Sequence, residues 1–349
     1  MRLLFVSAAS KLIGFGHLSR CIALAKYAKS HSFDVDFLVF GKKEAYSKVI
    51  VAGFGCVLLD ESHLSQVDWL YASHLRADAI VIDLLFPGFF AFKSNELLFR
   101  KLRALCRCLV IIDVLGVDSI SRRLRNIEVN IVISPYVGAD KGSLSNHWRH
   151  YLKGSKFVLL GSEFTNLPIR SQRNPANRVL VTCGGSDPNE FTIKVLLALN
   201  AIIHKLEIRV VVGPIFGANM LAKIERLVEI SEHKIKIVNS PHALLNEMLW
   251  CDVAIATNGL TKYELAASAT PALLLSIDED HELVNKPFAN MQTSIDLGIG
   301  VCPKRVGKEV VDLLANLALR ISMAIKGRAL VDGKGIERLF GAINKELSC

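Results

Sequence analysis

Residues 3–30 read LLFVSAASKLIGFGHLSRCIALAKYAKS, and this stretch decides the fold. Leu3–Ser7 is a short apolar run with the length and composition of a buried β-strand. After a loop that contains two glycines, His17–Ser30 has apolar residues at helical spacing. A strand that passes through a loop into a helix is the repeating unit of parallel α/β sheets. The chain is therefore expected to begin with such a unit.

The same alternation of strands and helices continues through the first half of the chain. The strands are nearly all apolar rather than alternating, which is typical of a parallel sheet covered by helices on both faces. Helices lie between the expected strands, one of them around Lys43–Val51. The further strands are expected at Val35–Phe40, Cys56–Leu59, Ala79–Ile82 and Leu109–Ile112.

This rhythm weakens between residues 130 and 177, a segment rich in glycine, serine, asparagine and proline. Such composition favours loops, so a domain boundary is expected here. We therefore predict an N-terminal Rossmann-like domain at residues 1–160, a linker at 161–177 and a C-terminal Rossmann-like domain at 178–349. The two are expected to face each other across a cleft lined by loops at the carboxyl ends of strands, where open α/β sheets bind ligands.

The alternation of strands and helices resumes in the second half of the chain. Strands are expected at Val179–Thr182, Ile208–Val212, Ile235–Ile237, Val253–Ala256 and Ala272–Ser276. Helices are expected at Asn189–His204, Ala218–Ile230, Pro241–Leu249 and Leu260–Ser268, and three more start at Glu282, Gly307 and Asp332.

Composition limits the classes of function. The 349 residues carry a formal net charge of +9, which suits an anionic ligand. The charge is diffuse, without a long basic run, so no nucleic-acid partner is expected. The eight cysteines form no Cys-x-x-Cys pair, and we expect buried, reduced thiols in a cytoplasmic protein, with no metal and no cofactor. Nothing in the sequence fixes the oligomeric state.

The first glycine loop, Gly14-Phe15-Gly16, lacks the third glycine of a dinucleotide-binding loop, because Ser19 stands in that position. The two glycines still let a ligand approach the backbone closely. His17 opens the following helix and is placed to transfer a proton near neutral pH. The alternative is a helix-start histidine with an ordinary hydrogen bond.

The second glycine loop, Gly184-Gly185-Ser186, again follows a strand and precedes a helix. Its backbone amides could cradle phosphate or sugar oxygens. Ser186 or Asp187 could equally cap the helix, with Pro188 at its first position. The two interpretations are compatible.

A third loop, at residues 257–261, leads from a strand into a helix that carries Glu264. The helix dipole would suit a pyrophosphate, and Glu264 could accept hydrogen bonds from ribose hydroxyls. Alternatively, Glu264 lies on the solvent face of a capped amphipathic helix. A fourth loop contains Asp280 and His281, which could hold sugar hydroxyls or could belong to an ordinary acidic helix start.

Four motifs occur in a characteristic order: Gly-Phe-Gly-His-x-x-Arg at 14–20, Cys-Gly-Gly-Ser-Asp at 183–187, Asn-Gly-x-Thr-x-x-Glu at 258–264 and Thr-Pro-Ala at 270–272. This order resembles the GT-B superfamily of nucleotide-sugar enzymes over most of the chain. It most resembles the UDP-sugar hydrolases of the pseudaminic acid pathway, which release 2,4-diacetamido-2,4,6-trideoxy-altrose from UDP with inversion at C1.

The resemblance implies roles for the motif residues. His17 matches the histidine that activates water or assists at the sugar–phosphate bond. The nucleotide would be bound by the second half of the chain and the sugar by the first, so the expected partner is a UDP-sugar. The matched binding positions are Gly14, Gly16, Arg20, Gly184, Gly185, Ser186, Asn258, Gly259, Thr261 and Glu264, and Asp280 and His281 are candidates at the sugar end.

Two positions depart from the hydrolase pattern. Residues 82–85 read Ile-Asp-Leu-Leu where the hydrolases have Ile-Asp-His-Tyr, and Asp280-His281 stand where they have Asn-Gln. The alternative function is a GT-B glycosyltransferase that uses a UDP- or CMP-sugar in polysaccharide assembly. Its acceptor could be lipid-linked, with weak membrane association through Leu84–Lys93, although a buried loop and helix is the favoured interpretation of that stretch. A third hypothesis is a non-catalytic nucleotide-sugar sensor.

Overall fold

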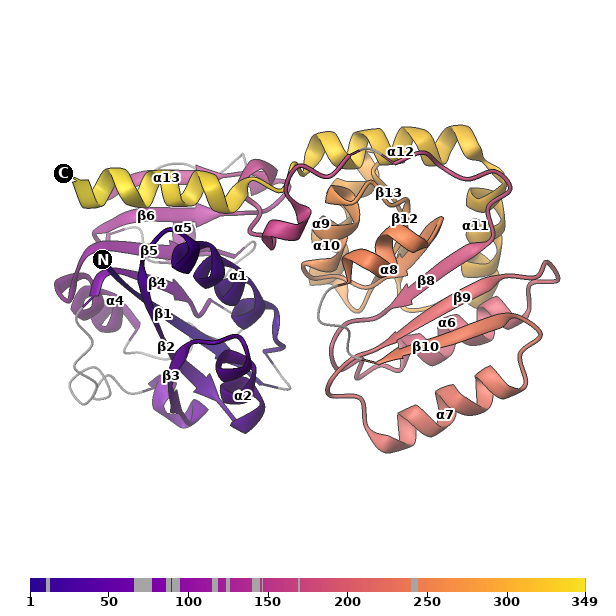
Figure 1. The fold of residues 1–349 in the computed structure, drawn as a ribbon, viewed down its shortest axis with the longest axis horizontal. Coiled ribbons are helices and arrows are strands. Elements are labelled where there is room, and N and C mark those ends of the chain that lie inside the picture. The colour runs from indigo at the N-terminus through magenta and orange to yellow at the C-terminus, as the bar shows by residue number, and fades with distance from the viewer. Residues whose placement is uncertain are drawn as a thin grey trace. The chain divides into compact units, whose positions relative to one another are not determined.

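Two compact units make up the protein. The computed structural model describes residues 1–10, 13–65, 77–85, 89, 95–114, 119–123, 126–139, 145, 147–168, 170–239 and 244–348. Unit 1 consists of Met1–Ser162 together with Gly333–Cys349, and unit 2 of Glu163–Asp332. Each unit is built around one parallel β-sheet with helices on its faces (Figure 1).

Unit 1 contains a seven-stranded sheet in the order β3-β2-β1-β4-β5-β6-β7. Its strands are β1 (Arg2–Ala9), β2 (Asp34–Gly41), β3 (Gly55–Leu59), β4 (Ala77–Asp83), β5 (Cys106–Ile112), β6 (Val129–Ser134) and β7 (Trp148–Lys153). Its α-helices among the described residues are α1 (Gly16–Ser30), α2 (Lys43–Val51), α4 (Asn95–Ala104), α5 (Ile120–Arg123) and α13 (Gly335–Ser348).

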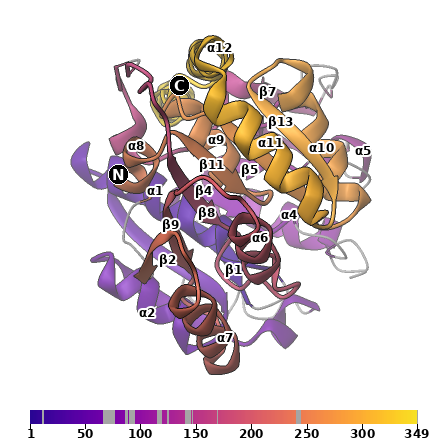
Figure 2. The same cartoon turned by 90° about the vertical axis from the view of Figure 1, so that its right-hand side faces the viewer.

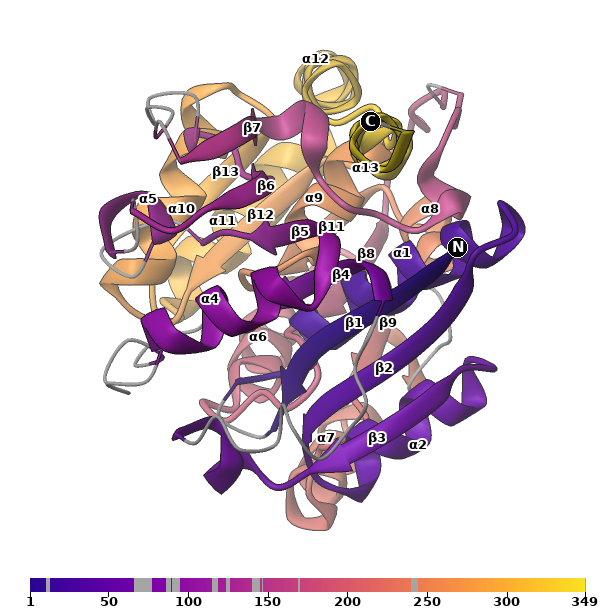
Figure 3. The ribbon, with the colours of Figure 1, turned by 90° about the vertical axis from the view of Figure 1, so that its left-hand side faces the viewer.

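Alternate residues of these strands pack on opposite faces of the sheet, because successive side chains of a strand point in opposite directions. Phe5 belongs to the core layer that α1, α2 and α13 cover. Val6, the next residue, belongs to the layer that α4 and α5 cover. Figure 3, which looks onto unit 1, shows α4 in front of the strands. Burial on both faces explains why these strands are apolar throughout.

Unit 2 contains a six-stranded sheet in the order β10-β9-β8-β11-β12-β13, with the same connectivity as the first six strands of unit 1. Its strands are β8 (Arg178–Thr182), β9 (Glu207–Val212), β10 (Lys234–Asn239), β11 (Val253–Ala256), β12 (Ala272–Ser276) and β13 (Ser294–Ile299). Its α-helices among the described residues are α6 (Phe191–Asn200), α7 (Ala218–Glu229), α8 (Leu245–Trp250), α9 (Thr261–Ala267), α10 (Glu279–Asn290), α11 (Pro303–Ala315) and α12 (Leu317–Leu330).

One face of the second sheet packs against α6, α7 and α11, which lie toward the viewer in Figure 2. Val195 of α6 and Val310 of α11 are fully buried against Val181 and Ile255 of the strands. The two sheets confirm the predicted fold class of two Rossmann-like parallel-sheet domains.

Several elements were not predicted, among them three strands and the helix α12. The strands β7 and β13 form edges of their sheets, where one side of the strand is not paired, so polar residues interrupt their apolar pattern. The strand β6 contains Asn130 and lies in the segment assigned to the boundary. The helix α12 follows α11 directly, and its signal is Asn316, whose side chain accepts a hydrogen bond of 2.9 Å from the backbone N–H of Leu319.

The predicted C-terminal boundary is wrong for the last residues of the chain. Residues 333–349 belong to unit 1, because α13 packs on the first sheet (Figure 1). Ile336, Leu339, Phe340 and Ile343 form the buried apolar stripe of this helix. The predicted linker also differs, since unit 2 begins at Glu163. A stripe of apolar residues shows that a helix is buried, but not which sheet buries it.

Replacement of Phe340 by alanine is expected to destabilise unit 1 by about 3–5 kcal/mol. Phe340 is 2% exposed, and its ring centroid lies 5.0 Å from that of Tyr27 and 5.8 Å from that of Phe33. Hydrogen exchange should therefore accelerate at the amides of β1 and not at those of β8. Lys345→Ala on the same helix serves as the control. Faster exchange in β8 alone would contradict the assignment of α13 to unit 1.

The apolar stretch at Leu84–Lys93 is buried where it is described. Leu84, Leu85 and Phe89 have no exposed surface, which favours the buried-loop interpretation, and residues 86–88 and 90–93 lie outside the described part. Within the described residues, no helix has both the length and the apolar character needed to cross a membrane. The cysteines are less uniform than expected, because Cys302 is exposed and Cys56 and Cys106 are half-buried.

Candidate functional site

The imidazole of His17 is held by a buried carboxylate. His17 lies in the first turn of α1, and its Nδ1 is 2.6 Å from Oδ1 of Asp83. Asp83 is the last residue of β4, and β4 pairs with β1, the strand that precedes the His17 loop. The sheet order therefore brings the two residues together. Asp83 has no exposed surface, whereas the His17 side chain is 16% exposed.

Arg20 completes the environment of Asp83. Its Nε donates to Oδ2 of Asp83, and its Nη2 donates to Oδ1 at 2.5 Å. Its Nη1 donates to the phenolic oxygen of Tyr136 at 2.7 Å. The guanidinium is 5% exposed, with all three of its nitrogens engaged inside the protein. Arg20 therefore positions Asp83, and this geometry gives no support to the direct ligand contact that the sequence predicted.

Asp83 is ionised in this cluster. Burial alone would raise its pKa, but the charges of Arg20 and His17 and their hydrogen bonds lower the pKa to about 2. Burial alone would lower the pKa of Arg20, but the charges and hydrogen bonds of Asp83 and Tyr136 together raise it. Burial raises the pKa of Tyr136, so its phenol is neutral. A bidentate pair of this kind is the geometry in which a buried charge is best compensated.

An ionised partner fixes the tautomer of His17. A carboxylate can only accept hydrogen bonds, so Nδ1 of His17 carries the hydrogen and donates it to Asp83. The unprotonated nitrogen of the neutral ring is then Nε2. This atom has no hydrogen-bond partner among the residues that the structure describes. His17 can therefore accept a proton at Nε2, and Asp83 stabilises the imidazolium that results.

Two members of this cluster, Asp83 and Tyr136, were not predicted as site residues. Asp83 was visible as an acid at the end of an apolar strand, but only the sheet order shows that β4 lies beside β1. Tyr136 follows β6, in the segment assigned to the domain boundary. The hydrolase pattern has a tyrosine at position 85, and here Leu85 is fully buried. A tyrosine hydroxyl is supplied to the cluster by Tyr136 from another loop.

The glycines beside His17 shape the start of α1. Gly14 adopts a φ of +78°, and its N–H donates to the carbonyl of Ser10 at 2.8 Å. Gly16 is the first residue of the helix, and a Cβ at this position would meet no atom within 4 Å. The first turn of α1 has no side-chain cap and no acidic residue. Among the described residues no side chain accepts from its first N–H groups, so they are available to an external acceptor.

In unit 2, the predicted binding loops follow neighbouring strands. β8 pairs with β11, and β11 pairs with β12, all in parallel. The loops after β8 and β11 contain Gly184–Ser186 and Asn258–Gly259, and Asp280–His281 lie in the first turn of α10, the helix that follows β12. The carboxyl ends of parallel strands lie at one edge of a sheet, so the structure brings these predicted residues together at the edge where open α/β sheets bind ligands.

The Gly184 loop needs glycine for its backbone conformation, not for lack of space. Gly184 has a φ of +89°, which side-chain-bearing residues rarely adopt, and a Cβ there would lie 3.9 Å from Oγ1 of Thr257. Asp187 is the cap: its carboxylate accepts 2.9 and 2.8 Å hydrogen bonds from the N–H groups of Phe191 and Thr192. Helix α6 begins at Phe191, so Pro188 precedes the helix instead of opening it.

The Asn258 loop turns at Gly259, which has a φ of +107°. Thr261 is the first residue of α9, a helix of seven residues, and Glu264 is half-buried in its first turn. The side chain of Asn258 accepts a 2.6 Å hydrogen bond from Nζ of Lys262. The sequence pattern indicated this loop but not the buried lysine behind it.

Asp280 and His281 lie in the first turn of α10. Asp278 caps this helix by accepting a 2.9 Å hydrogen bond from the N–H of His281, and its carboxylate is 2.6 Å from Nδ1 of the same residue. The hydrogen bonds from His281 lower the pKa of Asp278 although its partial burial opposes this. Asp280 is exposed. The alternative of an acidic helix start therefore describes the geometry, and both residues border the same sheet edge.

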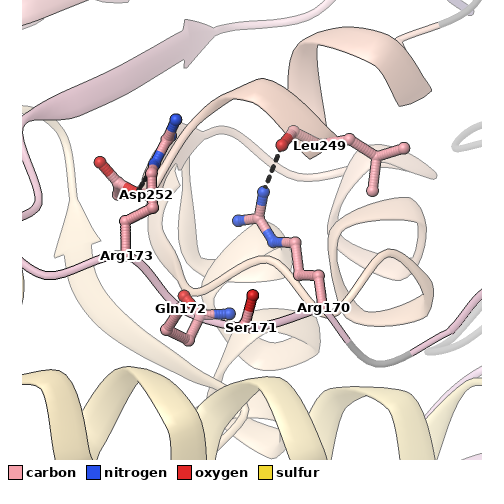
Figure 4. A pocket seen from close by; sticks show the side chains of 6 residues that line it. All are labelled: Arg170, Ser171, Gln172, Arg173, Leu249 and Asp252. Atoms are coloured by element: carbon pink, nitrogen blue, oxygen red, sulfur yellow. Dashed lines mark hydrogen bonds and ion pairs between the residues drawn. The ribbon is translucent and has the colours of Figure 1, made fainter.

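A pocket in unit 2 lies away from these loops. It has a volume of about 180 Å³ and is lined by residues 170–173, Leu249 and Asp252 (Figure 4). Asp252 precedes β11, so this pocket is at the amino end of the strand, opposite the glycine loops. Arg170 donates to the carbonyls of Leu249 and Cys251 at 2.7 and 2.6 Å, and Arg173 donates to Asp252 at 2.9 Å. These arginines hold the end of α8.

Two curated proteins are related to the chain at low identity, and no protein-family profile matches it. SpsG, a spore coat polysaccharide biosynthesis protein of Bacillus subtilis (strain 168), is 24% identical over 273 residues, which are 71% of this chain and 79% of SpsG. The uncharacterized protein MJ1062 of Methanocaldococcus jannaschii is 24% identical over 293 residues, 80% of this chain. The match spans 56% of MJ1062, about half the length of that relative.

Solved structures show the fold more fully. MurG of Acinetobacter baumannii superposes with a TM-score of 0.71 at 16% identity, over 99% of this chain and 100% of the MurG chain. HepE of Anabaena, determined in complex with UDP-glucose, superposes with a TM-score of 0.60 at 15% identity, over 100% and 99%. The chain therefore has the GT-B fold, and at sequence level it is related to SpsG.

Proposed function

We propose that the chain is a nucleotide-sugar hydrolase that releases a 2,4-diacetamido-trideoxy sugar from UDP, with inversion at C1. One observation carries this proposal: the ionised Asp83 fixes His17 so that Nε2 is available as a base. A general base is the group that a hydrolase needs to deprotonate water. The motif resemblance to UDP-sugar hydrolases of the pseudaminic acid pathway supports the sugar class, in nonulosonic acid biosynthesis.

In the proposed reaction, Nε2 of His17 takes a proton from water as the water oxygen bonds to C1 of the sugar. The bond between C1 and the β-phosphate oxygen breaks, and UDP leaves with its electron pair. Attack opposite the leaving group inverts C1. Asp83 compensates the positive charge that develops on His17, and Arg20 keeps Asp83 in place.

The nucleotide is assigned to unit 2. Gly184–Ser186, Asn258–Gly259 and Thr261 would bind the diphosphate through backbone amides and short polar side chains, and Glu264 would bind the ribose hydroxyls. Asp280 and His281 would contact the sugar end. The UDP-glucose complex of HepE, a protein of the same fold, supports a nucleotide sugar as ligand. The name of SpsG supports a place in polysaccharide biosynthesis.

A GT-B glycosyltransferase is the second candidate. The observation that favours it is at Leu84 and Leu85, which are fully buried where the hydrolases have a histidine and a tyrosine. The UDP- or CMP-sugar would then be transferred to a hydroxyl of an acceptor, and His17 would deprotonate that hydroxyl in place of water.

The release of UDP separates these candidates. The purified chain is incubated with UDP-2,4-diacetamido-2,4,6-trideoxy sugars and with UDP-N-acetylglucosamine, without any acceptor, and UDP is measured by chromatography. The proposal expects catalytic release from a diacetamido substrate. Release that depends on an added lipid-linked or soluble sugar acceptor would identify a glycosyltransferase, and no release under any of these conditions would overturn both.

A further inference from the structure

Lys262 is a buried cation behind the Asn258 loop. It is 3% exposed, and its Nζ donates to Oδ1 of Asn258 at 2.6 Å, to the carbonyl of Val284 at 2.9 Å and to Oδ1 of Asn285 at 3.1 Å. An ammonium group has three N–H donors, so these three acceptors satisfy it fully. All three are neutral. Buried lysines are ordinarily paired with a carboxylate, so this arrangement calls for an explanation.

The three acceptors come from different parts of unit 2. Asn258 follows β11, while Val284 and Asn285 belong to α10. Asn285 in turn donates to Oγ of Ser276 at 3.0 Å and lies 3.3 Å from the carbonyl of Leu275, at the end of β12. Lys262 therefore ties the loop after β11 to the helix after β12, at the sheet edge that carries the candidate nucleotide site.

This contact also orients the amide of Asn258. Nζ of Lys262 donates to the amide oxygen of Asn258, and in its protonated form it can only donate, so this oxygen faces the lysine. The amide nitrogen then carries the two remaining donors, and within the described residues it has no hydrogen-bond partner. Asn258 is half-buried, so these donors are not sealed in the core. A pair of free N–H donors suits an acceptor such as a phosphate oxygen.

Charged side chains at the start of α10 pair with one another. On α10, His281 pairs with Asp278, and Glu282 pairs with Lys286. On its own helix, Glu264 is two residues away, and the ring of Tyr263 lies 5.5 Å from Nζ.

The other packed elements add no carboxylate among the described residues. The ring of Phe288 on α10 lies 5.2 Å from Nζ. α12 brings Arg328 to the carbonyl of Ala267, at the far end of α9, and Arg320 to carbonyls of residues 313 and 314. Burial without a compensating charge lowers the pKa of Lys262 to about 7.

We propose that Lys262 is a positioning residue of the nucleotide site, which holds the amide N–H groups of Asn258 toward the diphosphate and takes up a proton when a nucleotide sugar binds. The inference rests on the proposed function, because it takes the ligand of this loop to be a nucleotide diphosphate. Lys262 acts through Asn258 and does not touch the ligand.

The proton uptake follows from electrostatics. A diphosphate near the loop favours the charged form of Lys262, so the pKa of this group rises on binding. Between the free and bound values, each binding event must therefore take up a proton. Affinity is greatest below the free value and falls as the pH rises toward the bound value. A lysine that only fills space in the core would show no such linkage.

The test measures the number of protons taken up on binding. Titration calorimetry with UDP-N-acetylglucosamine is carried out at pH 8 in two buffers of different ionisation enthalpy. This ligand has no phosphate ionisation in that range, and ordinary histidines are already neutral. The full-length wild-type chain should take up about half a proton or more per ligand. Lys308→Met, which removes an exposed lysine of α11, is the matched control and should behave in the same way.

Two variants remove the titration in different ways. Lys262→Met removes the cation and should bind the ligand about tenfold more weakly at pH 7, with no proton uptake. Lys262→Arg keeps a cation that does not lose its proton, so its affinity should be constant between pH 6.5 and 9, again without uptake. Thermal unfolding of both variants checks that unit 2 is folded.

The outcomes separate the two proposals. Proton uptake that persists unchanged in folded Lys262→Met and Lys262→Arg would overturn the role of Lys262 while leaving the nucleotide site intact. Absence of uptake in the wild type, with binding retained, would overturn it as well. No binding by the wild type at any pH would overturn the nucleotide site itself and the role of Lys262 with it.

Discussion

His17→Ala is expected to lower the rate of UDP release by about 10²–10⁴-fold. The reason is that Nε2 of His17 is the proton acceptor of the proposed reaction, held in the correct tautomer by Asp83. UDP binding should change little, because the nucleotide is assigned to residues of unit 2. The measurement is kcat for UDP release, together with the dissociation constant of UDP by calorimetry.

A matched control lies next to the C-terminal end of the same helix. His31 is exposed just beyond the end of α1, where its ring stacks on Tyr27 at 4.1 Å between centroids. His31→Ala removes a second histidine of unit 1 and should leave the rate within about twofold of wild type, as for most surface substitutions. If His17→Ala also kept its rate within about tenfold, His17 would not be the general base.

Asp83→Asn is expected to destabilise unit 1 by about 3–5 kcal/mol, because it leaves the buried guanidinium of Arg20 without a compensating charge. It should also lower the rate of UDP release, since an amide does not fix the tautomer of His17 as a carboxylate does. Urea denaturation followed by circular dichroism measures the first effect. The second is measured well below the unfolding midpoint.

The double variant Asp83→Asn with Arg20→Met tests the cause. Removal of both charges takes away the uncompensated cation, so the double variant should be more stable than Asp83→Asn alone. Its rate should stay low, because His17 still lacks its carboxylate. Arg20→Met alone is measured as well. A double variant whose loss of stability equals the sum of the losses in Asp83→Asn and in Arg20→Met would show that Arg20 and Asp83 are not coupled.

The same pair makes stability depend on pH in the acid range. The pKa of Asp83 is about 2 in the folded protein, and an unfolded aspartate titrates near 4. Asp83 therefore contributes stability that is fully present above about pH 5 and is lost as the pH falls toward 2, on the order of 2 kcal/mol. The stability difference between wild type and Asp83→Asn should shrink over this range. A difference that stays constant down to pH 2 would contradict an ionised Asp83.

Much of the fold could be predicted because parallel strands buried on both faces leave a strong apolar signal. β11 and β12 have the predicted bounds, and β1 and β8 differ only at their ends. The strands β7 and β13 were missed because polar residues interrupt their apolar pattern. The return of α13 to unit 1 could not be predicted, because an apolar stripe does not specify its partner.

The site residues that could be predicted are those that lie close together in the sequence and form a recognisable motif. The glycine loops and His17 were found because a turn and a helix start lie within a few residues of each other. Asp83, Tyr136 and Lys262 were missed for a common reason. Their roles depend on contacts that only the folded structure shows. Asp83 contacts His17, and Tyr136 contacts Arg20, across more than 60 residues of sequence. Lys262 lies behind the loop and contacts Asn258 and Asn285.

The central claim is that His17 directs water to C1 of a nucleotide sugar, and hydrolysis in H2¹⁸O tests it most directly. The account predicts that one ¹⁸O atom appears in the released sugar, that UDP carries none, and that proton NMR of the first product shows the anomer inverted relative to the substrate. Label in UDP would show that water attacks phosphorus, and this result would contradict the proposed hydrolysis at C1. Turnover that occurs only when an acceptor hydroxyl is supplied would contradict it as well.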